Sequence, residues 1–454
     1  MHGESTTLKR SLSMWQLVLL GLGFMTPMVV FDTFGIASEE TGGHVPASYV
    51  IALVALLFTA GSYAFMIKAF PNAGSAYTYT QKSIHPNLGF MVGWLALMDY
   101  MFLPMVNALI AQIYMTSWFP NAPAWIFVVV FVALVTAINL LSVKGTANMN
   151  SYLVLFQIGM VIVFVGISVW ALLSGKGVGS VWYPDAFFSG DIETSTLISG
   201  ATLLCFSYLG FDAVAGFAEE TDNPTRTIPR ALFLTALVGG LMFIVASYFA
   251  QALFPNVSDF NDPEASTPEM ALYLGGVVFK AIFLTAGFAG TIASAISSQA
   301  SVSRLMYAMG RDRMLPTRWF RHLSPRTHTP IFNTLFVGVV SLTAVFFSLD
   351  TATSFINFGA LTAFTFVNLS VIAHYVVRRK MLRSAKEVLS YLIIPTIGAA
   401  SMIVLWVNLD MHSIYLGIGW AVVGFISLIY STKGFRILPA DLNLSGTNKI
   451  DESM

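Results

Sequence analysis

Charged residues are scarce in this chain. They make up 10% of its 454 residues, against about 25% in an ordinary soluble domain. The single cysteine, Cys205, excludes an intramolecular disulfide and a metal site built of cysteines alone. Gly-rich phosphate loops and the HExxH and paired CxxC motifs are also missing. We therefore expect no metal, no cofactor and no enzymatic activity.

Apolar residues, in contrast, make up 56% of the chain. A protein of this composition needs lipid as its solvent, and a helix needs about 20 apolar residues to cross a bilayer. The sequence therefore predicts an all-α integral membrane protein with twelve transmembrane helices. The predicted spans are 15–37, 47–70, 90–118, 123–142, 151–173, 195–219, 231–253, 276–308, 331–349, 353–376, 389–408 and 413–431.

Basic residues predict the orientation of these spans. If the N-terminal segment 1–14 lies in the cytoplasm, only Lys176 and Lys280 fall in outer loops, as the positive-inside rule requires. Twelve spans then place the C-terminal tail, 432–454, in the cytoplasm as well. The outer loops are acidic, either because polar loops need charge for solvation or because their field concentrates cations at an entrance.

Residues that interrupt a helix occur in the first and sixth spans. They are Gly21, Gly23, Pro27 and Gly35 in the first span, and Gly200, Gly210 and Gly216 in the sixth. Such residues release backbone groups that lipid cannot satisfy. Interrupted helices at matching positions of two halves predict a binding site at the bilayer midplane, although kinks that only serve packing are the alternative. We predict inverted five-helix repeats over 15–173 and 195–376, followed by two extra helices over 389–431.

Three carboxylates lie inside predicted spans: Asp32 in the first, Asp99 in the third and Asp212 in the sixth. Each costs at least about 2.5–3.5 kcal/mol on an insertion scale, and such residues mark ion or substrate paths. No Lys or Arg lies at comparable depth, so the missing positive partner is predicted to be the substrate or a proton. Two alternatives are that Asp32 is solvated at the end of its span and that Asp212 caps a restarted helix.

Aromatic residues accompany these acids. They are Tyr100 beside Asp99, then Phe206, Tyr208 and Phe211 around the sixth-span break, and Phe24 and Phe31 beside the first-span break. Aromatic rings can cover a methylene chain or face an ammonium group. In membrane helices such rings also serve ordinary packing, so each ring alone is a weak indication of a site.

Several motifs together resemble the amino acid–polyamine–organocation (APC) transporter superfamily, which has the LeuT-type inverted-repeat fold with broken first and sixth helices. These motifs are residues 71–77 (PNAGSAY), 89–94 (GFMVGW), 206–212 (FSYLGFD), 219–230 (EETDNPTRTIPR) and 303–312 (SRLMYAMGRD). Within the superfamily the chain looks like the bacterial putrescine importers. That likeness rests on residues 26–35 (TPMVVFDTFG), 44–49 (HVPASY), 81–84 (QKSI), 98–105 (MDYMFLPM) and 356–370 (INFGALTAFTFVNLS).

The chain departs from the superfamily pattern at two places. Amino acid carriers of this kind have a Gly-small-Gly triplet at the first break, whose amides receive the substrate carboxylate. Pro27, Met28 and Val29 stand there in this chain, and proline offers no N–H. This favours an amine without an acid group. Some proton-coupled members have a lysine in the fifth span, where this chain has Gln157, so their proton site does not carry over.

Residues and resemblance together predict a secondary transporter of the inner (plasma) membrane. We expect it to import putrescine or a similar diamine by alternating access, driven by the membrane potential and with a proton as an optional co-substrate. The alternative is an amino acid permease of the same fold. Lipid is an expected partner and nucleic acid is not. The expected substrate-binding residues are Asp99 and Asp212 for the ammonium groups, Asp32 as a weaker candidate, and Thr26, Pro27, Met28, Tyr100, Phe206, Tyr208, Leu209 and Gly210.

Overall fold

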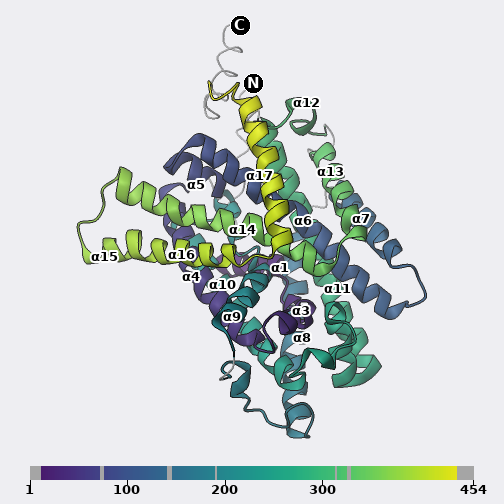
Figure 1. The fold of residues 1–454 in the computed structure, drawn as a ribbon. Coiled ribbons are helices and arrows are strands. Elements are labelled where there is room, and N and C mark those ends of the chain that lie inside the picture. Colours follow the sequence, from purple (N-terminus) through teal and green to yellow (C-terminus); the bar gives the residue numbers. More distant parts are fainter. Residues whose placement is uncertain are drawn as a thin grey trace.

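The structure is a computed structural model that describes residues 12–71, 76–140, 146–189, 192–311, 314–324 and 329–436. The tail beyond Arg436 lies outside these residues, as do residues 72–75 and 312 of two family motifs and the side chains of Glu219 and Glu220. The described residues form helices and no strand (Figure 1). The predicted all-α class is thereby confirmed.

Ten helices of the described chain are long and apolar enough to cross a membrane. Two shorter apolar helices, Ala124–Leu140 and Ile331–Phe346, occupy the places of the fourth and ninth predicted spans. The protein is therefore a multi-pass membrane protein. Its elements are α1 (Met14–Met25), α2 (Val29–Asp32), α3 (Phe34–Glu40), α4 (Val45–Ala69), α5 (Ala76–Ser83), α6 (Pro86–Trp118), α7 (Ala124–Leu140), α8 (Thr146–Leu173), η1 (Pro184–Ala186), α9 (Thr194–Leu204), η2 (Cys205–Tyr208), η3 (Asp212–Glu220), α10 (Pro224–Leu253), η4 (Val257–Asp259), η5 (Pro263–Ala265), α11 (Ser266–Arg311), α12 (Thr317–Phe320), α13 (Ile331–Leu342), η6 (Thr343–Phe346), α14 (Leu349–Val371), η7 (Ile372–Arg378), α15 (Ala385–Val388), η8 (Leu389–Ile393), α16 (Ile394–Val407) and α17 (Met411–Ser431).

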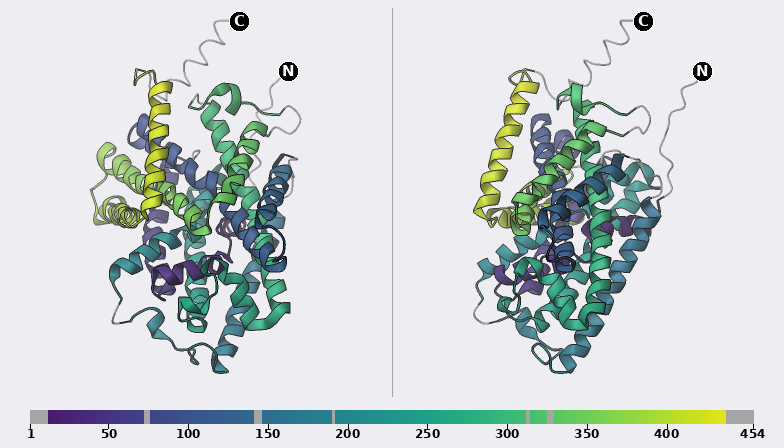
Figure 2. Two further views of the ribbon diagram at one scale, coloured as in Figure 1. Left: turned by 45° about the vertical axis from the view of Figure 1, so that its right-hand side comes forward. Right: turned by 90° about the vertical axis from the view of Figure 1, so that its right-hand side faces the viewer.

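Helix α6 is the central element of the bundle. Its most apolar stretch is 89% buried inside the protein, whereas that of α17 is only 22% buried. The right-hand view of Figure 2 shows α17 at the edge of the molecule. Two tryptophans join these helices: the indole N–H of Trp94 donates to the carbonyl of Trp420, and that of Trp420 donates to the carbonyl of Trp94, both at 2.9 Å. Thus α17 lies at the periphery of the bundle but is anchored to its core.

Both predicted helix interruptions are present. In the first span, α1 ends at Met25, Thr26 has a positive φ of 54°, and α2 starts at Val29. In the sixth, α9 ends at Leu204 and passes through the 3-10 helix η2 to Gly210, which has φ +103°. Glycine is the residue that adopts this backbone conformation without strain. The sixth-span break therefore has a local cause in Gly210. In the first span, Pro27 disfavours a helical conformation at the preceding Thr26.

Helix α11 begins ten residues before the predicted eighth span, because two helical segments are joined across a bend at Gly275 and Gly276. Gly276 has φ +66° and ψ −163°, a conformation reserved almost entirely for glycine. The predicted span, 276–308, corresponds to the second segment alone. The first segment, 266–274, lies beside the second half of the first span, where Ser266 donates to the carbonyl of Phe31 at 2.9 Å.

Candidate functional site

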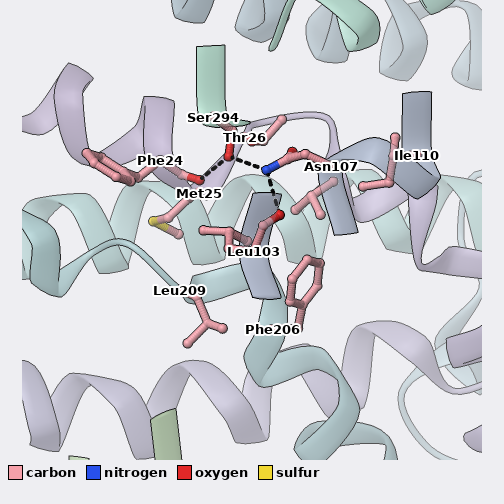
Figure 3. A pocket seen from close by; sticks show the side chains of 10 residues that line it. Phe24, Met25, Thr26, Leu103, Asn107, Ile110, Phe206, Leu209 and Ser294 are labelled. Atoms are coloured by element: carbon pink, nitrogen blue, oxygen red, sulfur yellow. Dashed lines mark hydrogen bonds between the residues drawn. The ribbon is translucent and has the colours of Figure 1, made fainter. Parts of the chain in front are cut away.

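The two helix breaks enclose a small cavity. Its volume is about 10 Å³, which is roughly the space that one water molecule requires. The cavity lies where α1, α2, α6, η2 and α11 meet (Figure 3). Its lining consists of Phe24, Met25, Thr26, Val29, Leu103, Asn107, Ile110, Phe206, Leu209 and Ser294.

A chain of hydrogen bonds crosses one wall of this cavity. The side-chain amide of Asn107 donates to the hydroxyl of Ser294 at 3.1 Å and to the carbonyl of Leu103 at 3.0 Å. Ser294 donates in turn to the carbonyl of Phe24 at 3.5 Å, as Figure 3 shows. The Phe24 carbonyl belongs to the last turn of α1, where helical partners run out. Residues of α6 and α11 thus satisfy the broken end of the first span.

A second, larger cavity opens on the side of the molecule where α1 begins, which we call the N-terminal face. Its volume is about 360 Å³. Its lining consists of Leu12, Leu20, Phe24, Ile138, Asn139, Asn150, Phe217, Ile296, Ser297, Ala300, Ser301, Ser303, Arg304, Thr329, Pro330 and Thr334. Phe24 belongs to both linings. The two cavities are therefore neighbours that share Phe24 as a lining residue.

Asp99 and Asp212 are gathered with tyrosines on one side of the small cavity. Oδ2 of Asp212 accepts hydrogen bonds from the hydroxyls of Tyr63 on α4, at 3.2 Å, and Tyr100 on α6, at 3.0 Å. Asp99 is 5% exposed and Asp212 is 8% exposed, and the two carboxyls are close enough to interact electrostatically. Asp99 itself has no hydrogen-bond partner among the side chains that the structure describes.

Tyr79 of α5 extends this group. Its ring packs edge-on against Tyr63 with centroids 6.0 Å apart, and its buried hydroxyl has no hydrogen-bond partner. The result is a buried group of two carboxyls and three phenols, which we call the Asp99–Asp212 cluster. It consists of Asp99, Asp212, Tyr63, Tyr79 and Tyr100. Carboxylates beside aromatic rings are suited to an ammonium group.

One face of α6 connects this cluster with the small cavity. Residues 99, 103, 107, 110 and 114 are spaced three or four apart, so they lie along one side of the helix. Leu103, Asn107 and Ile110 line the cavity. Asp99 lies one turn before Leu103, and Tyr114 lies one turn after Ile110. At 1.5 Å per residue this stripe is about 22 Å long, so it extends beyond the small cavity at both ends.

Asp32 lies at the other end of that stripe. Its Oδ1 accepts hydrogen bonds from the hydroxyl of Tyr114 at 2.5 Å and from that of Thr267 at 2.8 Å. The residue is only 4% exposed. The alternative that Asp32 is solvated at the end of its span is therefore wrong. The three carboxylates flank the small cavity, with Asp32 on one side and Asp99 and Asp212 on the other.

Comparison with known proteins identifies the family. A sequence model described as "Amino acid permease" matches residues 16–433. The chain belongs to the amino acid permease family. Its predicted membership of the APC superfamily is thereby confirmed.

The relatives of this permease include transporters with different substrates. It is 47% identical over 429 residues to the "Low-affinity putrescine importer PlaP" of Escherichia coli strain K12, covering 94% of this chain and 95% of that protein. It is 26% identical over 474 residues to the "Branched-chain amino acid permease BcaP" of Bacillus subtilis, covering 96% of each. The "Methylthioribose transporter" of the same organism is 27% identical over 462 residues, covering 95% of each.

The structure distributes the predicted site residues of this permease over three places. Thr26, Phe206 and Leu209 line the small cavity, and Gly210 borders it through Phe24. Asp99, Tyr100 and Asp212 belong to the Asp99–Asp212 cluster, and Asp32 lies beyond the cavity. Pro27, Met28 and Tyr208 are buried but do not line the cavity.

Tyr208 has a structural contact instead. Its hydroxyl donates to the carbonyl of Tyr49 at 3.1 Å, and its ring packs on Phe243 with centroids 5.5 Å apart. Sequence reasoning missed Asn107 and Ser294, which with Thr26 are the polar side chains of the cavity lining. The spacing of Asn107 from Asp99 on α6 could have indicated it. No local signal distinguishes Ser294 from other serines of α11.

Proposed function

We propose that this permease imports putrescine or a similar diamine by alternating access. The observation that carries the proposal is the Asp99–Asp212 cluster of two buried carboxyls. Among the described residues, Asp99 has no hydrogen-bond partner, and Asp212 is bonded to the hydroxyls of Tyr63 and Tyr100 and to backbone groups but to no cation. A doubly protonated diamine would supply the missing positive charge. The relative named as a putrescine importer, 47% identical over nearly the whole chain, supports the same substrate.

The first-span break offers little to a substrate carboxylate. Pro27 has no N–H, and the N–H of Val29 donates to the carbonyl of Thr26 at 2.9 Å. The N–H of Phe31 donates to the carbonyl of Met28 at 3.0 Å. The N–H groups of Val29 and Phe31 are thus already hydrogen bonded within the chain, and Pro27 has none. The break therefore favours an amine over an amino acid as substrate. The amino acid alternative is supported by the likeness to the branched-chain amino acid permease.

The two faces of the molecule differ in a way that alternating access requires. On the N-terminal face, the large cavity adjoins the small one at Phe24, which lines both. On the opposite face, Asp32, Tyr114 and Thr267 are hydrogen bonded to one another. We propose that the N-terminal face is cytoplasmic, in accordance with the positive-inside rule, so that the structure represents an inward-open state without room for a diamine in its small cavity.

We further propose that the movement involves the repeats 15–173 and 195–376. Each repeat contributes one broken helix to the small cavity, which is the arrangement expected when one bundle rocks against the other around a central site. In this scheme α7 and α13 complete twelve spans, and the helices over 389–431 lie outside the repeats. The inner membrane of a bacterial cell is the proposed location.

Uptake of labelled putrescine into proteoliposomes tests the proposal. We expect unlabelled diamines to compete with putrescine, and leucine, isoleucine and arginine to compete weakly or not at all. Protein-free liposomes provide the background. Strong competition by an amino acid, with no competition by diamines of other lengths, would replace the proposal with the amino acid alternative.

A further inference from the structure

The bonds of Asp32 join three elements that are distant in sequence. Asp32 ends α2, Tyr114 belongs to α6, and Thr267 belongs to the first segment of α11. Neighbouring bonds reinforce this junction: Ser266 donates to the carbonyl of Phe31 at 2.9 Å and accepts from the N–H of Gly35 at 3.2 Å. We call these contacts the outer gate. They hold residues 266–274 against the outer half of the first span.

The outer gate is built so that it can separate. Residues 266–274 are joined to the membrane-spanning part of α11 by the bend at Gly275 and Gly276. Gly276 has nothing within 4 Å of the position that a Cβ would occupy. We take this glycine bend as the hinge on which the segment leaves α2 while the rest of α11 stays in place. Opening of this gate would expose Asp32 to water on the opposite face.

Among the residues that the structure describes, no positive side chain bonds to Asp32 or interacts with it electrostatically in the closed gate. The titratable groups around it are Tyr114 of α6 and, through its electrostatic interaction, Tyr49 of α4. The acids that flank Thr267 bond elsewhere: Glu264 accepts from the N–H of Leu349. Glu269 accepts from the N–H groups of residues 261 and 262.

The residue before Asp32, Phe31, lies among apolar aromatic rings. Phe31 packs against Phe164 of α8, with centroids 4.4 Å apart, and against Phe283 of α11, at 5.0 Å. An ionised carboxylate is costly in such surroundings unless a cation or a proton neutralises it. Both hydroxyl donors also bind the same oxygen, Oδ1, which leaves Oδ2 as the atom where a proton can reside.

We propose that Asp32 binds one proton when the outer gate closes and releases it to the external water when the gate opens. An O–H bond forms at the carboxylate on closing and breaks on opening, so each cycle of the gate takes up and returns one proton on the same face. This role rests on the proposed alternating access, and it makes Asp32 a proton site rather than a ligand of the substrate. External acid then favours the state that is open to the N-terminal face.

The reactivity of a cysteine placed in the large cavity measures the population of the state that is open to the N-terminal face. Ser301 lines this cavity, and the native Cys205 is buried, so Ser301→Cys provides one reactive thiol. A membrane-impermeant maleimide is applied at the N-terminal face of protein in proteoliposomes while the pH of the opposite face is varied. We expect labelling to accelerate as that pH falls, by at most about tenfold per pH unit for a single proton. The chain without Ser301→Cys measures the background.

Three variants in the Ser301→Cys chain locate the proton. Asp32→Asn is neutral and has nearly the same shape, so we expect fast labelling at every external pH. Asp410→Asn, a change at another carboxylate of the opposite face, is the matched control and keeps the pH response. Tyr114→Phe retains the carboxyl but removes one donor, so the response remains with a displaced midpoint. This last variant keeps the proposal testable if Asp32→Asn fails to fold.

A pH response that persists in Asp32→Asn, or one that is absent from the parent reporter chain, would overturn the proton site. Labelling needs no substrate, so the result is independent of whether putrescine is transported. If putrescine is transported while labelling ignores external pH, only the role of Asp32 fails. If labelling follows external pH while putrescine is not transported, only the substrate assignment fails.

Discussion

Asp99 and Asp212 share a cluster but differ in how they are held. Two phenols donate to Asp212, and these bonds stabilise a negative charge there. Asp99 has no such donor among the described side chains, although it lies on the cavity-lining face of α6. Asp99 is therefore the carboxyl whose charge is the less well stabilised of the two. We expect the interaction of an ammonium group with Asp99 to contribute more binding free energy than its interaction with Asp212.

We expect Asp99→Asn to weaken putrescine binding roughly tenfold to a hundredfold, because a hydrogen bond to a charged group contributes about 1.5–3 kcal/mol. The KM of putrescine uptake measures this effect. Asp185→Asn, at an exposed carboxylate of η1, is the control and leaves the KM unchanged. An unaltered KM in Asp99→Asn would remove Asp99 from the set of substrate ligands.

The broken helices depend on each other for their shape. At Gly210 a Cβ would lie 2.4 Å from Cβ of Phe24 and 3.2 Å from its carbonyl carbon. The sixth-span break thus packs directly against the last turn of α1 at Phe24, the residue that lines both cavities. A glycine is required at this position for two reasons, the close approach and the positive φ.

Gly210→Ala is expected to abolish most transport and to destabilise the fold by about 1–3 kcal/mol, the cost of holding a non-glycine residue in a strained conformation. Uptake and thermal unfolding in detergent measure the two effects. Gly216→Ala in the following 3-10 helix is the matched control, because nothing lies within 4 Å of its Cβ position. Equal behaviour of the two variants would show that the contact with Phe24 does not shape the site.

At the scale of the whole molecule, the carboxylates follow one face of the most buried helix. The stripe runs from the Asp99–Asp212 cluster, past Leu103, Asn107 and Ile110, to Asp32. The small cavity in its middle adjoins the large cavity at Phe24. If the proposed diamine follows this stripe, it carries its charge through the membrane field.

Putrescine uptake is therefore expected to be electrogenic. Moving one charge through 100 mV contributes about 2.3 kcal/mol, so two charges contribute about 4.6 kcal/mol, enough for roughly 10³-fold accumulation. Vesicles with an imposed potassium diffusion potential and no pH gradient measure this contribution. Full accumulation driven by a pH gradient alone, at zero potential, would contradict the electrical account.

The sequence by itself determined the membrane class, the positions of the helix breaks and the three intramembrane acids. These follow from local properties: the length of apolar runs, the missing N–H of Pro27 and the backbone freedom of Gly210. The predicted start of the eighth span was wrong because α11 contains two helical segments that meet at a glycine bend. Hydropathy does not detect such a bend.

The tertiary structure alone decided what each acid contacts. Tyr114 and Thr267 reach Asp32 from 82 and 235 residues away, and Asn107 meets Ser294 across 187 residues. Such contacts depend on how helices pack around α6, and a single sequence contains no local pattern that specifies them. Composition could place three negative charges in the membrane, but only packing could divide them into a cluster on one side of the cavity and a gate on the other.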